Sequence, residues 1–156
     1  MMRNNPELNR KLVSLLFIVG GIAGVTIALW TEVSILMQHL SAKHGVAALM
    51  GGFAFIFGLC TWTGVELWLE KPAAFRLAQI LLIAQIPNIS FHSFAYQFYT
   101  GLTLYLSLSM RPDVVTGFEF QLGSALEIRI SPEIEGFVLG VNLVAIVALY
   151  LLGKSR

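Results

Sequence analysis

Polar side chains recur at helical spacing in one otherwise apolar segment of the chain, residues 73–99. On a helix that advances by about 100° per residue, five of them fall within an arc of about 80°. Amides, phenols and an imidazole can bind a small polar solute or ion, and an imidazole also titrates near neutral pH. Together with an asparagine from another apolar segment, they are the predicted cavity or ligand-binding residues: Gln85, Asn88, His92, Tyr96, Tyr99 and Asn142.

This polar stripe has two interpretations. In the first, the side chains hydrogen-bond to neighbouring helices and fix their packing, each bond contributing about 0.6 kcal/mol. In the second, they line a hydrated cavity or a path through the protein. The clearest opposing polar groups are only Thr61, Thr63 and Asn142. Because an unpaired buried polar group costs about 1–3 kcal/mol, we expect the stripe to line a cavity.

Catalysis is the least favoured function class. The sequence contains no zinc-protease, nucleophile-elbow, phosphate-loop or paired-cysteine motif. Glu32, His39 and His44 are spaced by seven and five residues, which fits no standard zinc pattern. The single aspartate, Asp113, lies in a loop between apolar segments, and Cys60 has no cysteine to pair with. We therefore expect no catalytic residue, no metal and no cofactor.

The composition indicates a membrane protein. Of the 156 residues, 56% are hydrophobic and 12% are charged, whereas about 25% of the residues of an ordinary soluble domain are charged. Ten basic and nine acidic residues give a net charge of +1. That balance excludes a nucleic-acid partner, because no cationic surface is left for a phosphate backbone. The expected partner is the lipid bilayer.

Four segments are apolar and long enough to cross a bilayer as helices, which takes about 20 residues each. Pro87 should kink the third segment, since proline removes a backbone donor. Seven lysine or arginine residues lie on the side of the termini and three on the other side. This asymmetry places both termini in the cytoplasm and the protein in the cell (inner) membrane. The predicted transmembrane helices are 12–36, 45–69, 73–99 and 134–152.

The segment between the last two predicted helices, residues 102–131, alternates between apolar and polar residues. A period of two indicates strands, and Gly123-Ser124 suits a two-residue hairpin turn. We expect a small three-stranded antiparallel sheet outside the cytoplasm, with its apolar face buried. The predicted inward residues are Leu106, Phe120 and Ile128, and the predicted outward residues are Tyr105, Glu119 and Arg129.

The sequence thus predicts a single all-α membrane domain over residues 1–156, a four-helix transmembrane bundle with this sheet inserted. Its expected function is channel-like or transporter-like: a polar cavity or pore for a small solute, ion or ligand. The alternative is a non-transporting partner or assembly subunit of a larger membrane complex. Small residues four apart, Gly20, Gly24 and Ala28 as well as Gly136 and Gly140, let helices approach closely. They pack the bundle internally or join it to a second copy or another membrane protein.

Overall fold

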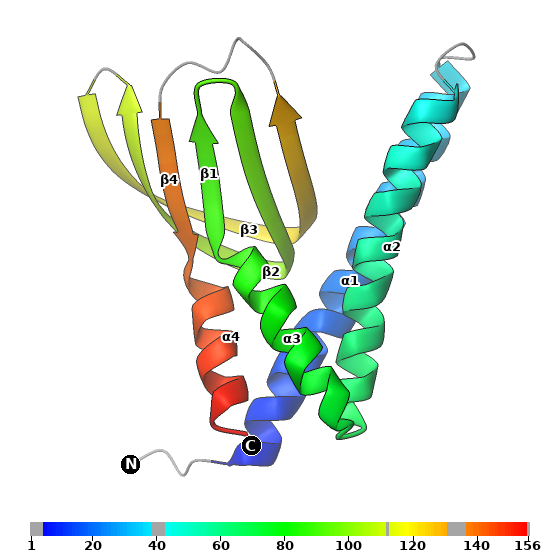
Figure 1. Ribbon diagram of the computed structural model, residues 1–156, viewed down its shortest axis with the longest axis vertical. Coiled ribbons are helices and arrows are strands. Elements are labelled where there is room, and N and C mark those ends of the chain that lie inside the picture. Colours follow the sequence, from blue (N-terminus) through cyan, green and yellow to red (C-terminus); the bar gives the residue numbers. More distant parts are fainter. Residues whose placement is uncertain (1–4, 39–42, 112, 131–136, 156) are drawn as a thin grey trace.

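The computed structural model describes residues 5–38, 43–111, 113–130 and 137–155. Two long helices form an antiparallel hairpin that runs the full height of the molecule (Figure 1). Two shorter helices stand beside the end of this hairpin that carries both termini, and a four-stranded sheet stands beside its other end (Figure 1). The elements are α1 Pro6–Gln38, α2 Lys43–Trp68, α3 Pro72–Gln85, β1 Pro87–Phe91, β2 Phe94–Arg111, β3 Asp113–Ile130, β4 Phe137–Asn142 and α4 Leu143–Gly153.

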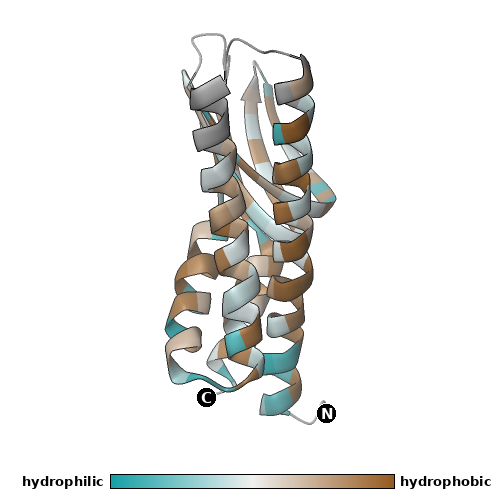
Figure 2. Ribbon diagram, turned by 90° about the vertical axis from the view of Figure 1, so that its right-hand side faces the viewer, coloured by the Kyte–Doolittle hydropathy of each residue, from teal (hydrophilic) through white to brown (hydrophobic). Residues whose placement is uncertain are grey.

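The first two predicted transmembrane helices are confirmed as helices. Residues Pro6–Ser34 of α1 and Met50–Trp68 of α2 are long and apolar enough to cross a membrane. Apolar residues cover most of both helices, and hydrophilic residues gather near the end that carries the termini (Figure 2). Their exposed side chains include Leu15, Val19 and Phe55.

The predicted four-helix transmembrane bundle is wrong, because the third segment and the described part of the fourth are half helix and half strand. Helix α3 has 14 residues and α4 has 11, and about 20 are needed to cross a bilayer. Pro87 ends the third segment's helix instead of kinking it. Beyond it, aromatic and β-branched residues favour a strand that pairs with β2 and β4. The described part of the fold is therefore mixed α and β. The channel-like function expected of a four-helix bundle is not supported either.

Three strands of this bent sheet are paired in a closed circuit, which we call the ring. Strand β1 pairs antiparallel with the first half of β2 and with β4, and β4 pairs with the second half of β2. Strand β3 follows β2 along its whole length. Both strands bend where Gly101 pairs with Gly123, and these glycines have φ values of +79° and +124°. The predicted turn at Gly123-Ser124 is therefore a bend within one strand, and the sheet extends well beyond residues 102–131.

Each face of this ring has its own chemistry. Residues that are paired across strands lie on the same face of a sheet. Asn88 of β1 pairs with Gln97 of β2 and with Gly140 of β4, so these three residues define one face of the ring. We call this the inner face. Among the described residues its polar members include Asn88, Ser90, Gln97, Tyr99, Thr103, Tyr105, Ser107, Ser109, Glu119, Gln121, Glu127, Arg129 and Asn142, and it also carries Ala95, Val115, Val138 and Gly140. The outer face of the second half of β2, the first half of β3 and β4 carries Leu102, Leu104, Leu106, Leu108, Met110, Val114, Phe118, Phe120, Leu122, Phe137, Leu139 and Val141.

The predicted alternation was correct, but the direction of the faces was wrong at several positions. Tyr105, predicted outward, has an exposed fraction of 0%, whereas Phe120, predicted inward, is 61% exposed. Leu106 and Ile128 are also exposed. The burial is local, because Val115 and Glu119 share the face of Tyr105 and are exposed. Of the described part of that face, only the region around Thr103, Tyr105 and Asn142 is covered by the rest of the fold.

The ring is fastened to α1 at a close backbone contact. A Cβ atom on Gly20 would lie 2.3 Å from the backbone nitrogen of Gly101. Ser124 Oγ donates a hydrogen bond to the Gly20 carbonyl at 2.5 Å and accepts one from the Gly101 N–H at 3.1 Å. The small residues of α1 therefore pack against other parts of the same protomer, because Gly24 also lies against the phenyl group of Phe57. The helical core lies below this contact and includes Val13, Phe17, Leu67, Leu82, Ala148 and Leu152.

Candidate functional site

The candidate site is the part of the inner face that lies beside the bend of β2. Tyr105 is completely buried there, and Asn142 of β4 is its partner across the strands. The ring of Tyr99 meets that of Tyr105 edge to face, with 6.2 Å between centroids. Thr103, two residues before Tyr105 on the same face, is also completely buried. Gly140 leaves space for its neighbour, because a Cβ at this position would lie 3.2 Å from the Cβ of Asn88.

Asn142 holds this region together because it ends β4 and caps α4. Its Oδ1 accepts hydrogen bonds from the backbone N–H groups of Val144 at 3.1 Å and Ala145 at 3.3 Å. Asparagine is among the preferred helix N-caps for this reason. Its own N–H donates to the Ile86 carbonyl at 2.8 Å. Asn142 therefore links the junction between α3 and β1 to the junction between β4 and α4.

Two buried amide nitrogens in this region have no hydrogen-bond partner. Among the described residues, Asn142 Nδ2 and Gln85 Nε2 are buried and donate no hydrogen bond within the protein. A buried group without a partner costs about 1–3 kcal/mol. Asn142 belongs to the inner face, so this face carries a buried amide donor next to the hydroxyl of Thr103.

The charges around the site lie on β3. Gln97 Nε2 donates to Gln121 Oε1 at 3.4 Å, and Gln121 in turn donates to the carboxylate of Glu119. Further along the strand, Glu127 forms an ion pair with Arg129. Burial raises the pKa of Tyr99, and the nearby carboxylate of Glu119 raises it further. The phenols at the site therefore stay neutral at physiological pH.

Tyr105 should make the stability of the fold sensitive to alkaline pH. Burial raises the pKa of its phenol to about 12, whereas a free phenol has a pKa of about 10. The folded state then holds this proton more tightly than the unfolded state, so stability should fall as pH rises from about 10 to 12. Thermal unfolding in detergent should show a smaller fall for Tyr105→Phe than for the parent chain. Equal falls for both proteins would contradict this assignment.

The six residues predicted from the sequence do not form one stripe in the structure. Asn88, Tyr99 and Asn142 share the inner face. Tyr96 lies on the outer face, where its phenol donates to the Ala84 carbonyl of α3 at 2.8 Å. The helical spacing that grouped them is lost because the helix ends at Gln85.

Gln85 and His92 have contrasting positions. The Oε1 atom of Gln85 is buried and accepts from both the N–H and the hydroxyl of Thr100, each at 3.1 Å. His92 is exposed in the turn between β1 and β2, with a φ value of +50°. Gln85 is therefore part of the packing beneath the ring, and His92 lies in a surface turn.

Sequence reasoning missed Thr103 and Tyr105. Tyr105 was predicted to face outward, and Thr103 was not among the predicted site residues. The signal was present in the alternation of residues 102–108, where every second residue is leucine and the intervening residues are polar or tyrosine. That pattern separates two faces but does not say which one a closed ring will bury.

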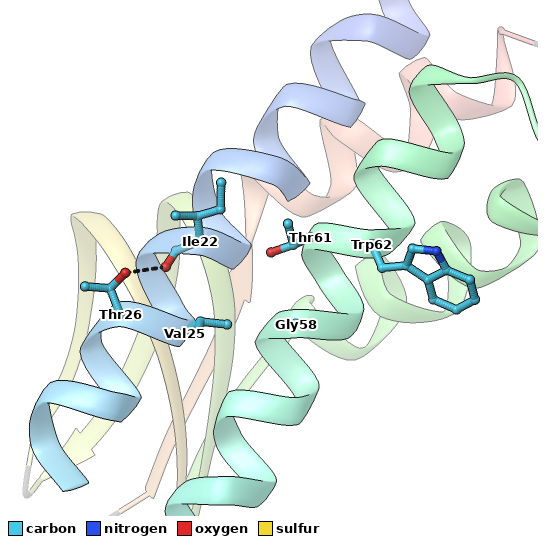
Figure 3. A pocket seen from close by; sticks show the side chains of 6 residues that line it. All are labelled: Ile22, Val25, Thr26, Gly58, Thr61 and Trp62. Carbon is cyan, nitrogen blue, oxygen red and sulfur yellow. Dashed lines mark hydrogen bonds between the residues drawn. The ribbon is translucent and has the colours of Figure 1, made fainter. Parts of the chain in front are cut away.

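An apolar groove lies between the two long helices. It is a groove of about 400 Å³ lined by Ile22, Val25, Thr26, Gly58, Thr61 and Trp62 (Figure 3). The hydroxyl of Thr26 donates to the Ile22 carbonyl at 2.9 Å, and that of Thr61 donates to the Phe57 carbonyl at 3.1 Å. Because both donors are used within their own helices, the groove offers an apolar surface without polar selectivity.

Comparisons with protein families, with characterised proteins and with solved structures find no match for this chain. Within residues 5–38, 43–111, 113–130 and 137–155, no three His, Cys, Asp or Glu side chains lie close enough together to hold a metal ion. The function must therefore be argued from the ring and its surroundings.

Proposed function

We propose that this chain is an integral membrane protein that binds a small, uncharged, hydrogen-bonding molecule inside the ring of strands. The observation that carries the proposal is the group of buried polar residues on the inner face, Thr103, Tyr105 and Asn142, behind an outer face that is largely apolar. A soluble domain has the opposite arrangement, with apolar residues inside and polar residues outside. A polar interior behind an apolar exterior suits a protein that presents its binding surface within or beside lipid.

The helices support the membrane assignment. Helices α1 and α2 would cross the bilayer, with both termini on the cytoplasmic side. The end that carries the termini is rich in charge: Arg10 of α1 pairs with Glu70 of the α2–α3 turn. Lys11 lies over the ring of Trp68 at 5.4 Å, and Lys154 over that of Tyr150 at 4.6 Å. Basic residues beside aromatic rings are typical of a membrane–water interface.

The position of the ring fits this arrangement. It stands beside the half of α1 and α2 that is remote from the termini (Figure 1). Strand backbone is tolerated at membrane depth only where its polar groups are paired or line a polar cavity. Strands β1 and β4 are paired on both sides. The inner face would then be reached from the extracytoplasmic side, where the turns and ends of the strands lie.

The ligand chemistry follows from the inner face. Neutral phenols, an amide and hydroxyls supply both donors and acceptors, and the most buried positions, Thr103, Tyr105 and Asn142, carry no formal charge. An ion that had lost its hydration shell would need an opposite charge beside these three residues. Small amides, polyols and sugars have the matching hydrogen-bonding groups.

Cysteine accessibility tests the two faces. Ser107 and Leu106 are neighbours on β2 that belong to the inner and outer face. In sealed vesicles of known orientation, Ser107→Cys should react with a membrane-impermeant methanethiosulfonate from the extracytoplasmic side. Leu106→Cys should react only with a lipid-soluble maleimide, and the parent chain supplies the background because Cys60 is buried. Equal reaction of both variants with the impermeant reagent would contradict the proposal.

The ligand itself can be sought with the same variant. A set of small amides, polyols and sugars is screened by thermal shift on the detergent-solubilised parent chain. A solute that stabilises the protein should slow labelling of Ser107→Cys at least several-fold, and Thr103→Val should weaken that protection. A stabilising solute that leaves the labelling rate unchanged binds elsewhere and would count against the ring as the site.

A further inference from the structure

Strand β3 has a free edge along its first half. On one side it pairs with β2 from Asp113 to Ile130, and within the described part of the chain no strand pairs with its other side. Its second half lies near α1, where Ser124 bonds to Gly20. In the first half the outer-face side chains are widely exposed, with fractions between 61% and 75%, at Val114, Phe118, Phe120 and Leu122.

This edge lacks the usual protection against pairing. An edge strand presents a row of unpaired N–H and C=O groups, and proteins commonly protect it with lysine, proline or a bulge. Residues 114–122 contain no lysine and no proline, and they pair with β2 without interruption. Their single charged residue, Glu119, belongs to the inner face. Beside lipid the unpaired backbone groups have no water to bond to, so pairing with another strand would stabilise this edge.

A second copy of the same strand fits this edge. A two-fold axis perpendicular to the sheet at Phe118 would place Phe118 opposite Phe118 of the second copy. Thr116 would then face Phe120 of the second copy, and Val114 would face its Leu122. All these outer-face pairs are aromatic, aliphatic or β-branched, which are the favourable cross-strand pairs. On the inner face Glu119 would lie opposite Gly117 of the second copy, so the two carboxylates would not meet directly.

We propose that two copies of this chain associate by antiparallel pairing of residues 114–122 of β3, which joins their two sheets. The apolar outer faces would then form one surface across both protomers. The proposal rests on the free edge and its symmetric side-chain pattern, and it does not depend on what the inner face binds.

Disulfide trapping tests the register. In a Cys60→Ala background, Phe118→Cys would place two thiols opposite each other, with Cβ atoms about 4.5–5.5 Å apart. Mild oxidation in membranes should convert most of this variant to a covalent dimer on non-reducing gels. Leu106→Cys is the matched control. Leu106 is exposed on the outer face, but β2 is paired on both sides at this residue and has no free edge there. Absence of the dimer for Phe118→Cys, or equal dimer for both variants, would overturn the proposal.

The oligomeric state gives a second measurement. Light scattering in mild detergent should find the parent chain dimeric, and Phe118→Lys should raise the dissociation constant at least tenfold. Leu106→Lys should leave the dimer intact, and both variants should show cooperative thermal unfolding. A parent chain that is monomeric at all concentrations, or that cross-links through position 118 only to a different protein, would overturn the self-pairing.

Discussion

Gly20→Ala should lower the free energy of unfolding in detergent by about 3 kcal/mol, the upper part of the range for overpacked sites. The new methyl carbon would lie 2.3 Å from the Gly101 nitrogen and 2.6 Å from the Thr100 carbonyl carbon. Both atoms are backbone, so α1 and the ring must move apart. That movement would also disturb the hydrogen bond from Ser124 to the Gly20 carbonyl.

Gly58→Ala is the matched control for this prediction. Alanine is favoured over glycine in a helix by up to about 1 kcal/mol, and a Cβ atom on Gly58 would meet no atom within 4 Å. The two glycine-to-alanine changes should therefore have opposite signs, which a thermal unfolding series in one detergent can measure. If Gly20→Ala were also neutral or stabilising, the close contact between α1 and β2 would be wrong.

Gln85→Leu should destabilise the protein by about 2 kcal/mol, because each buried donor left without a partner costs about 1–3 kcal/mol. The substitution removes the acceptor of both the Thr100 N–H and the Thr100 hydroxyl. Loss of the unpaired Gln85 Nε2 offsets part of this cost. The measurement is the unfolding midpoint in detergent, together with the denaturant dependence.

His92 provides the contrast, since the sequence placed it in the same stripe. It is exposed and has a positive φ, a backbone conformation that costs an L-residue about 1–2 kcal/mol and glycine little. His92→Gly should therefore be neutral or slightly stabilising. A similar loss of stability for Gln85→Leu and His92→Gly would mean that the two residues share one buried environment, contrary to the structure.

Much of the local structure could be predicted from the sequence. The two long apolar helices depend on composition and length within single segments, so they were found with nearly correct bounds. The alternation along residues 102–122 likewise separates two faces of a strand without any tertiary information.

The end of the third helix was harder to predict. A helical wheel grouped Gln85 with Asn88 and Tyr99, because apolar segments of this length in a membrane protein are usually helical throughout. Pro87 was recognised as a disturbance. Whether Pro87 kinks the helix or ends it depends on whether the residues that follow can pair with another strand. One such strand, β4, lies about fifty residues further along the chain.

The sequence by itself determined the apolar helical hairpin, the alternating strands and the set of polar residues that need partners, because each of these is encoded within a short stretch of chain. Only the tertiary structure decided that β2 pairs with both β1 and β4, since this depends on contacts such as Asn88 with Gly140 and Tyr105 with Asn142. The tertiary structure also decided which part of each face is buried. It covered Thr103 and Tyr105 and left Phe118, Phe120 and Leu122 of β3 exposed, because burial depends on which other elements pack against a face and alternation along one strand does not encode those contacts.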